Sequence, residues 1–147
     1  MAGEQDETIA LMAIKPRFAK LIFDGEKEVE FRKVNFSKEP ETIIVYATDP
    51  IQKVIGSFDV GKIKQGKPVK LWREYEGMGG INKEEFEKYF GPRDSGIAIK
   101  VRNTTKFDEP VSLESFCGVS TPPQNFQYLD FDEIKSDNYS RMGEIQF

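Results

Sequence analysis

The stretch IKPRFAKLIFDGEKEVEFRK, residues 14–33, carries the densest structural signal in this 147-residue chain. Pro16 predicts the first residue of a helix, because the missing N–H of proline costs nothing at that position. Gly25 predicts the end of the helix. The next segment, Glu28–Arg32, alternates between polar and apolar residues, which is the period of a half-buried strand. The stretch therefore predicts a strand–helix–turn–strand unit.

Four charged side chains of this unit are expected to line one cleft. Lys15 ends the first strand, and Lys27 follows the helix. Glu30 and Arg32 lie on one face of the second strand. An arginine fork suits a phosphate or a base edge, and a lysine supplies a charge, or a nucleophile if burial lowers its pKa. The alternative is a surface strand with a Glu30–Arg32 ion pair and solvated lysines.

The rest of the chain reads mainly as strands with a few short helices. Asn82 predicts the N-cap of a helix ending at Phe90, and Ser112–Phe116 predicts one helical turn. Gly56 indicates a bulge or a close backbone approach within its strand. The fold class expected is α+β, a small and mostly antiparallel β-barrel with two or three short helices at its ends. The other strands expected are Thr8–Ile14, Thr42–Ala47, Val54–Val60 and Ser95–Arg102.

Three segments are expected along the chain: a short acidic extension over residues 1–7, a domain over residues 8–131 and a polar tail over residues 132–147. No apolar run is long enough to span a membrane, and the acidic start lacks the basic residues of a secretory signal. The single cysteine, Cys117, fits a reducing compartment. We therefore expect a soluble, cytoplasmic protein without membrane contact.

The chain has no histidine, which excludes several kinds of active site. Ser–His and Cys–His nucleophile pairs and histidine-liganded metal centres all need that residue. The acidic residues show no spacing typical of a metal site. We expect neither a metal nor a cofactor. Catalysis, if present, would depend on Lys, Asp, Glu, Ser, Thr, Tyr or Cys117.

Charge is unevenly distributed along the chain, although the formal net charge is −4. Residues 50–73 carry six basic side chains and one acidic side chain, a net of 6 − 1 = +5. Residues 106–147 carry three basic and eight acidic side chains, a net of 3 − 8 = −5. A basic region of this kind suits a nucleic-acid partner, whereas ordinary charge scatter is the alternative.

The order of these residues resembles the signature of the ASCH domain family, which belongs to the PUA-like superfamily. The opening pattern is Lys15-Pro16, a short helix, and then Gly25, Lys27, Glu30 and Arg32. The resemblance covers about residues 8–130. Further matches are Tyr46-Ala47, Gly56, Leu71-Trp72, Tyr89-Phe90, Pro110-Val111-Ser112-Leu113 and Pro122-Pro123-Gln124-Asn125-Phe126.

This resemblance implies a β-barrel with a cleft between barrel and helices, and an association with RNA. One branch of the family removes the acyl group from N4-acetylcytidine with a catalytic lysine, whose position is that of Lys27. The branch's assisting threonine is replaced here by Glu30, which puts that reaction in doubt, and Glu74 is a weaker candidate for its assisting glutamate. Glu30 would act as a base beside Lys27 or form an ion pair that keeps the lysine charged.

Other candidate binding residues lie outside the opening unit. Lysines near an aromatic ring suit a single-stranded backbone with a stacked base, although the core is the favoured place for Trp72 itself. Asn125 could read a polar ligand edge through its amide, and Tyr46 offers a hydroxyl or a core side chain. The basic patch comprises Lys62, Lys64, Lys67, Lys70, Trp72 and Arg73.

The sequence supports a main hypothesis and two alternatives. The first is binding of RNA, another single-stranded nucleic acid or a modified nucleotide in the basic cleft. The second is a lysine-dependent hydrolase acting on a modified nucleoside of the N4-acetylcytidine type, or a nuclease, with Lys27 and Glu30 as catalytic residues. The third is a protein-interaction domain whose acidic tail mimics nucleic acid.

Overall fold

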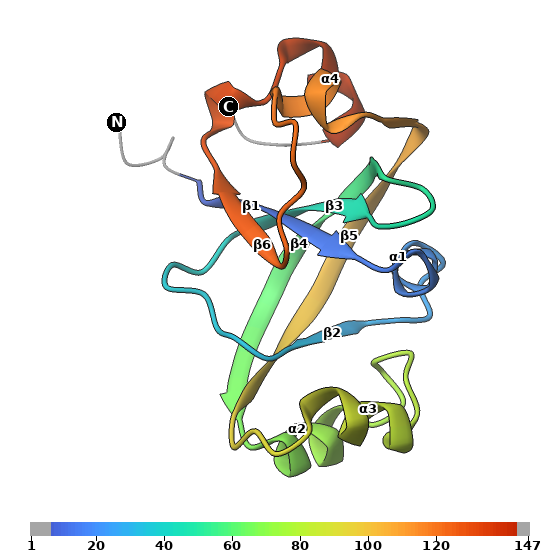
Figure 1. Ribbon diagram of the computed structural model, residues 1–147, viewed down its shortest axis with the longest axis vertical. Coiled ribbons are helices and arrows are strands. Elements are labelled where there is room, and N and C mark those ends of the chain that lie inside the picture. The colour runs from blue at the N-terminus through green and yellow to red at the C-terminus, as the bar shows by residue number, and fades with distance from the viewer. Residues whose placement is uncertain (1–6, 144–147) are drawn as a thin grey trace.

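One six-stranded sheet organises the chain (Figure 1), and the computed structural model describes residues 7–143. The strand order is β2-β5-β4-β3-β1-β6. β1 and β3 are parallel, and the other four neighbouring pairs are antiparallel. The mostly antiparallel α+β architecture is therefore confirmed. The strands are β1 (Ile9–Ile14), β2 (Val29–Arg32), β3 (Thr42–Ala47), β4 (Lys53–Gly66), β5 (Gly96–Val111) and β6 (Phe126–Leu129).

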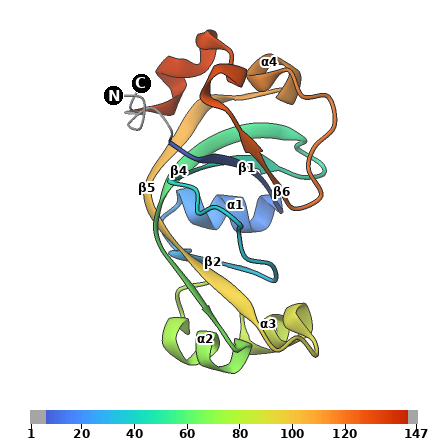
Figure 2. The ribbon, with the colours of Figure 1, turned by 90° about the vertical axis from the view of Figure 1, so that its left-hand side faces the viewer.

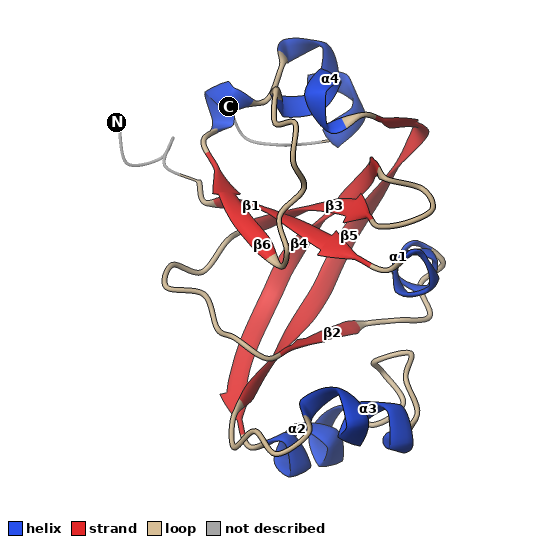
Figure 3. Cartoon of the chain, viewed as in Figure 1, coloured by secondary structure: helices blue, strands red, loops and turns tan. Residues whose placement is uncertain are grey.

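The sheet curves into a half-barrel around helix α1 (Figure 2). α2 and α3 cover one end of the molecule, and α4 with two 3-10 helices covers the other (Figure 3). The described helices are α1 (Pro16–Phe23), α2 (Pro68–Tyr75), α3 (Lys83–Phe90), α4 (Leu113–Cys117), η2 (Phe131–Glu133) and η3 (Ser136–Met142).

Helix α2 is an addition to the helices expected from the sequence. It begins with Pro68 at the first position, but it buries only Leu71 and Tyr75. These two residues are four positions apart and lie on one helical face, but the segment was interpreted as a basic patch and not as a helix. α1 and α3 lie where they were expected, and the Asn82 side chain accepts a hydrogen bond from the Glu85 N–H at 2.8 Å, as predicted for an N-cap.

β4 and β5 are longer than their sequence patterns indicate, with 14 and 16 residues. Their register shifts at several points. Near α2, β5 pairs with β4 on one side and with β2 on the other. The additional β4 residues, 61–66, are exposed or half-buried, so they lack the buried apolar positions that identify a half-buried strand.

The buried side chains form three clusters around the sheet. One lies between the sheet and α4, one surrounds α1, and one joins β2 to α2 and α3. Ile134 and Met142 are buried in the first cluster, so the segment after residue 131 contributes to the core. The boundary expected at residue 131 stays a prediction. Residues 1–6 and 144–147 of the two expected terminal segments lie outside the described residues.

Gly56 on β4 allows α1 to lie against the sheet. A Cβ atom at this position would lie 2.5 Å from both the Phe23 ring and the Thr105 carbonyl oxygen. The β3–β4 and β4–β5 registers both shift beside it. The structure thus shows both the irregularity and the close approach indicated by the sequence.

We expect Gly56→Ala to lower the free energy of unfolding by about 1–3 kcal/mol, because the methyl group overpacks a site bounded by backbone. Urea denaturation measures this change. Gly66→Ala is the matched control in the same strand, since its Cβ would meet only Leu71, at 3.8 Å. An equal loss of stability in both variants would contradict the close-packing explanation.

Candidate functional site

A pocket of about 280 Å³ opens where the end of β1, α1, β2 and α3 meet. The predicted strand–helix–turn–strand unit forms most of its wall. α3 adds a tyrosine from one side, and the segment before β6 adds an amide from another. The lining residues are Ala13, Lys15, Phe18, Lys27, Glu30, Phe31, Arg32, Thr48, Ile81, Tyr89 and Gln124.

The loop between α2 and α3 packs directly against this unit. The carbonyl oxygen of Met78 accepts hydrogen bonds from the N–H groups of Glu28 and Val29, at 2.7 and 3.0 Å. A Cβ on Gly79 would collide with the Phe31 ring, and Gly80 has a φ of +65°. These two glycines therefore let the loop backbone reach the base of the pocket.

Lys27 is anchored at that point by backbone and carboxylate oxygens. Its Nζ donates to the Gly79 carbonyl oxygen and lies 3.3 Å from Glu30 Oε1. The Phe18 ring centroid is 5.0 Å from the same nitrogen, within the range of a cation–π contact. Only 3% of Lys27 is exposed. An ammonium has three N–H groups, so these two oxygens leave one for a ligand.

Glu30 joins Lys27 to Arg32 through its two oxygens. Its Oε2 accepts from Arg32 Nε at 2.9 Å. Arg32 also donates from Nη1 to Asn125 Oδ1 at 2.6 Å and from Nη2 to the Ala13 carbonyl oxygen at 2.7 Å. These contacts use three of the five guanidinium N–H groups, so the fork is fixed in orientation and keeps donors for a ligand.

Burial lowers the pKa of Lys27 below its ordinary value, and the Glu30 carboxylate opposes that shift. The Tyr89 hydroxyl at the pocket wall has its pKa raised, mainly by burial. The lining contains Lys15, Lys27 and Arg32 against one carboxylate, so its formal charge is positive. Such a lining favours an anionic ligand.

The structure brings together five of the residues expected to form the site. Lys15, Lys27, Glu30 and Arg32 line one pocket, with Lys15 exposed at its rim. Asn125 reaches this group through its hydrogen bond to Arg32.

Four other candidate residues lie elsewhere. Tyr46 is buried in the cluster below α4, where burial raises its pKa. Glu74 lies 3.2 Å from Lys64 in an exposed ion pair. Trp72 lines a second groove, between α2 and α3, and Lys70 is exposed on α2. Apart from Asn125, the candidate residues outside the opening unit therefore lie in regions separate from the pocket.

Sequence reasoning did not assign several pocket residues a role in the site. Phe18 and Phe31 belong to the opening unit, and both contribute to the pocket wall. Tyr89 comes from α3, far along the chain, and only its place in the resemblance to a known family drew attention to it. No sequence pattern marks Thr48 or Ile81 as a residue of the site.

The described part of the chain lacks two kinds of feature. Between residues 7 and 143, no three Cys, Asp or Glu side chains are grouped so that they could hold a metal ion. Among the helices of the same range, none has the length and apolar character needed to cross a membrane.

Comparisons with known proteins agree with this architecture. Residues 10–122 match the model of the family described as "Domain of unknown function (DUF365)". The crystal structure of the ASCH protein from Zymomonas mobilis superposes with a TM-score of 0.78 at 29% identity, covering 85% of this chain and 90% of that chain. A Zymomonas mobilis protein named ASCH domain-containing ribonuclease is 29% identical over 139 residues, which is 92% of this chain and 93% of that protein.

Two Ureaplasma parvum proteins also contain a similar region. The large ribosomal subunit protein uL22 is 32% identical over 127 residues, and ATP synthase subunit alpha is 31% identical over 128 residues. The chain spans about 40% of the first protein's length and 16% of the second's. Each match therefore concerns one segment of a longer protein.

The half-barrel and its structural neighbours define the class of protein as an ASCH domain of the PUA-like fold. The chain belongs to the ASCH family and to the DUF365 family, whose model matches most of its length.

The lowered pKa of Lys27 predicts a pH dependence of stability. Between that lowered pKa and the unfolded value of about 10.4, the unfolded chain binds more protons than the folded one at this residue, so the free energy of unfolding rises with pH. We expect wild type to gain stability relative to Lys27→Met as the pH rises from 7 toward about 10. Urea denaturation at several pH values measures the difference.

Lys20→Met is the control for this experiment. Lys20 is exposed, and its pKa is raised by Asp24, so its contribution falls as the pH rises. The same pH trend for both lysines, or no trend for Lys27, would show that burial does not shift its titration.

Proposed function

We propose that the pocket around Lys27 binds one nucleotide of a single-stranded nucleic acid, with RNA as the natural partner. The observation that carries this proposal is a pair of linked ion pairs, Lys27–Glu30 and Glu30–Arg32, at the base of an open pocket with aromatic walls. Two cations and one carboxylate hold each other in place, and unused N–H groups of both cations remain for a ligand. A phosphate or a base carbonyl accepts such hydrogen bonds.

The pocket walls suit the base of a nucleotide. Phe18 and Tyr89 supply aromatic rings, and single-stranded RNA is commonly recognised by stacking its bases on such side chains. Lys15 at the rim supplies a positive charge for a backbone phosphate. The combination of rings inside and cations around them is typical of proteins that hold single strands.

RNA is favoured over DNA by one of the relatives. The similar Zymomonas mobilis protein carries ribonuclease in its name, and the match covers 93% of that protein. A domain similar over nearly its whole length supports the same type of partner here. The N4-acetylcytidine reaction has less support, because Glu30 fills the position of the assisting threonine and is bound to Lys27 and Arg32.

Cleavage of RNA is the second candidate function, favoured by the lowered pKa of Lys27. A neutral Lys27 amine would accept the proton of a ribose 2′-hydroxyl. The 2′-oxygen would then bond to the adjacent phosphorus, and the bond from phosphorus to the 5′-oxygen would break. The proton would pass to the leaving 5′-oxygen, giving a cyclic phosphate and a 5′-hydroxyl.

Binding is tested with a labelled single-stranded RNA at several salt concentrations. We expect affinity to fall steeply with salt, because phosphate contacts release counterions. Lys15→Met should lower the slope of log affinity against log salt by about 0.7, the value for one contact to a single strand. Lys106→Met, an exposed change on β5, is the control and should keep the wild-type slope. The proposal fails if wild type binds no RNA, or if both variants behave alike.

Cleavage is tested by comparing wild type with Lys27→Arg and Lys27→Met on the same RNA. Lys27→Arg keeps the positive charge but cannot become neutral near pH 7. If the amine is the base, cleavage rises with pH in wild type and falls by about 100-fold or more in both variants. Cleavage by Lys27→Arg at the wild-type rate would exclude this role and leave binding as the function.

A further inference from the structure

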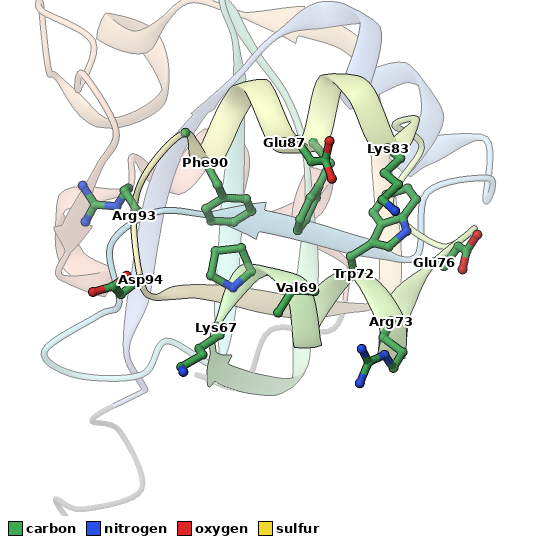
Figure 4. Close-up of a pocket in the computed structure, with 13 residues that line it drawn as sticks. Lys67, Val69, Trp72, Arg73, Glu76, Lys83, Glu87, Phe90, Arg93 and Asp94 are labelled. Atoms are coloured by element: carbon green, nitrogen blue, oxygen red, sulfur yellow. The ribbon is translucent and has the colours of Figure 1, made fainter.

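A second groove, of about 600 Å³, lies between α2 and α3 (Figure 4). Apolar side chains from both helices form its floor. Val69 on α2 is 60% exposed, which is unusual for an apolar side chain inside a groove. The apolar lining residues are Pro68, Val69, Trp72, Phe86 and Phe90.

Trp72 has one side against the core and the other toward the groove. Its ring lies 5.1 Å from the Phe86 ring at an angle of 50°, and the residue remains partly exposed. Both rings line the groove. An indole held in this way offers a rigid stacking surface without the loss of side-chain freedom that a mobile residue incurs on binding.

Basic side chains surround this floor (Figure 4). Lys67 and Arg73 come from the α2 segment, Lys83 begins α3, and Arg93 follows it. In the described part of the chain, none of these four forms an ion pair, although Glu76, Glu87 and Asp94 lie on the same rim. Lys67 also stands at the N-terminus of α2, which has no side-chain cap and carries a partial positive charge.

A layer of packed aromatic side chains lies between the two sites. Phe31 lines the pocket at Lys27 and meets Phe86 of the groove edge-to-face, with ring centroids 4.8 Å apart. α3 carries Tyr89 toward the pocket and Phe90 toward the groove. A single-stranded RNA that passes from the pocket over α3 would therefore reach the groove next.

We infer that the α2–α3 groove is a second nucleotide subsite, in which a base stacks on Trp72 and backbone phosphates contact Lys67 and Arg73. This inference rests on the proposed function, since it extends the path of the same RNA strand. Stacked aromatic rings with nearby cations are the means by which proteins hold single strands without reading their sequence. The groove thus lengthens the binding site without adding base selectivity.

The experiment uses Trp72 as its own reporter, because it is the single tryptophan of the chain. An oligouridine of about twelve nucleotides, a length within the range of single-strand binding sites, is titrated into the full chain. Anisotropy of a labelled copy measures total binding, and indole emission measures occupancy of the groove. We expect saturable quenching of the emission at the same RNA concentration that saturates the anisotropy.

A double variant, Lys67→Gln with Arg73→Gln, removes the two phosphate contacts from exposed positions and leaves Trp72 unchanged. It should lower affinity about tenfold and reduce the salt slope by about 1.4, which is two contacts to a single strand. Lys38→Gln with Lys106→Gln makes the same charge change elsewhere and should bind like wild type.

The two proposals fail in distinguishable ways. If RNA binds but indole emission stays constant, and the Lys67/Arg73 variant keeps its affinity, the groove is not a nucleotide subsite while the pocket at Lys27 stands. If RNA does not bind wild type at all, the proposed function and this inference both fail.

Discussion

The Glu30 carboxylate is the interaction on which the site depends. Removing a charge from water costs several kcal/mol, and a buried pair repays this only with good geometry and further hydrogen bonds. Glu30 meets that condition by giving one oxygen to Lys27 and the other to Arg32. The Gly79, Ala13 and Asn125 oxygens then satisfy further N–H groups. A 5% exposed carboxylate thereby allows two cations to stand at the base of a pocket.

This arrangement also bears on what Glu30 can do chemically. Both of its oxygens already contact cations, at 3.3 Å from Lys27 Nζ and 2.9 Å from Arg32 Nε, so neither is left free to contact a ligand proton. Lys27 is affected in two opposite directions, since burial favours the neutral amine and Glu30 favours the charged one. RNA binding would use the charged form of Lys27, and RNA cleavage would use the neutral form. The protonation state of Lys27 therefore distinguishes the two candidate functions.

Much of the fold could be predicted from local pattern, because its signals lie close together in sequence. The helix over Pro16–Phe23, its stop at Gly25 and the strand over Val29–Arg32 follow from neighbouring residues. The clustering of Lys15, Lys27, Glu30 and Arg32 follows from the same unit. The positions of Tyr46, Trp72 and Glu74 could not be predicted from local sequence, because they depend on how distant elements pack. Tyr89 and the Gly79 carbonyl reach the pocket for the same reason, from segments about 50 or more residues away.

The loop before α3 holds Lys27 by its main chain and not by a side chain. A carbonyl oxygen is present whatever residue carries it, so most side chains of that loop can change over evolutionary time without altering the anchor. Gly79 and Gly80 are the exceptions, since a larger residue would push the backbone away. Substitutions in this loop can therefore change the shape of the pocket mouth, while the buried charges of the pocket keep their positions.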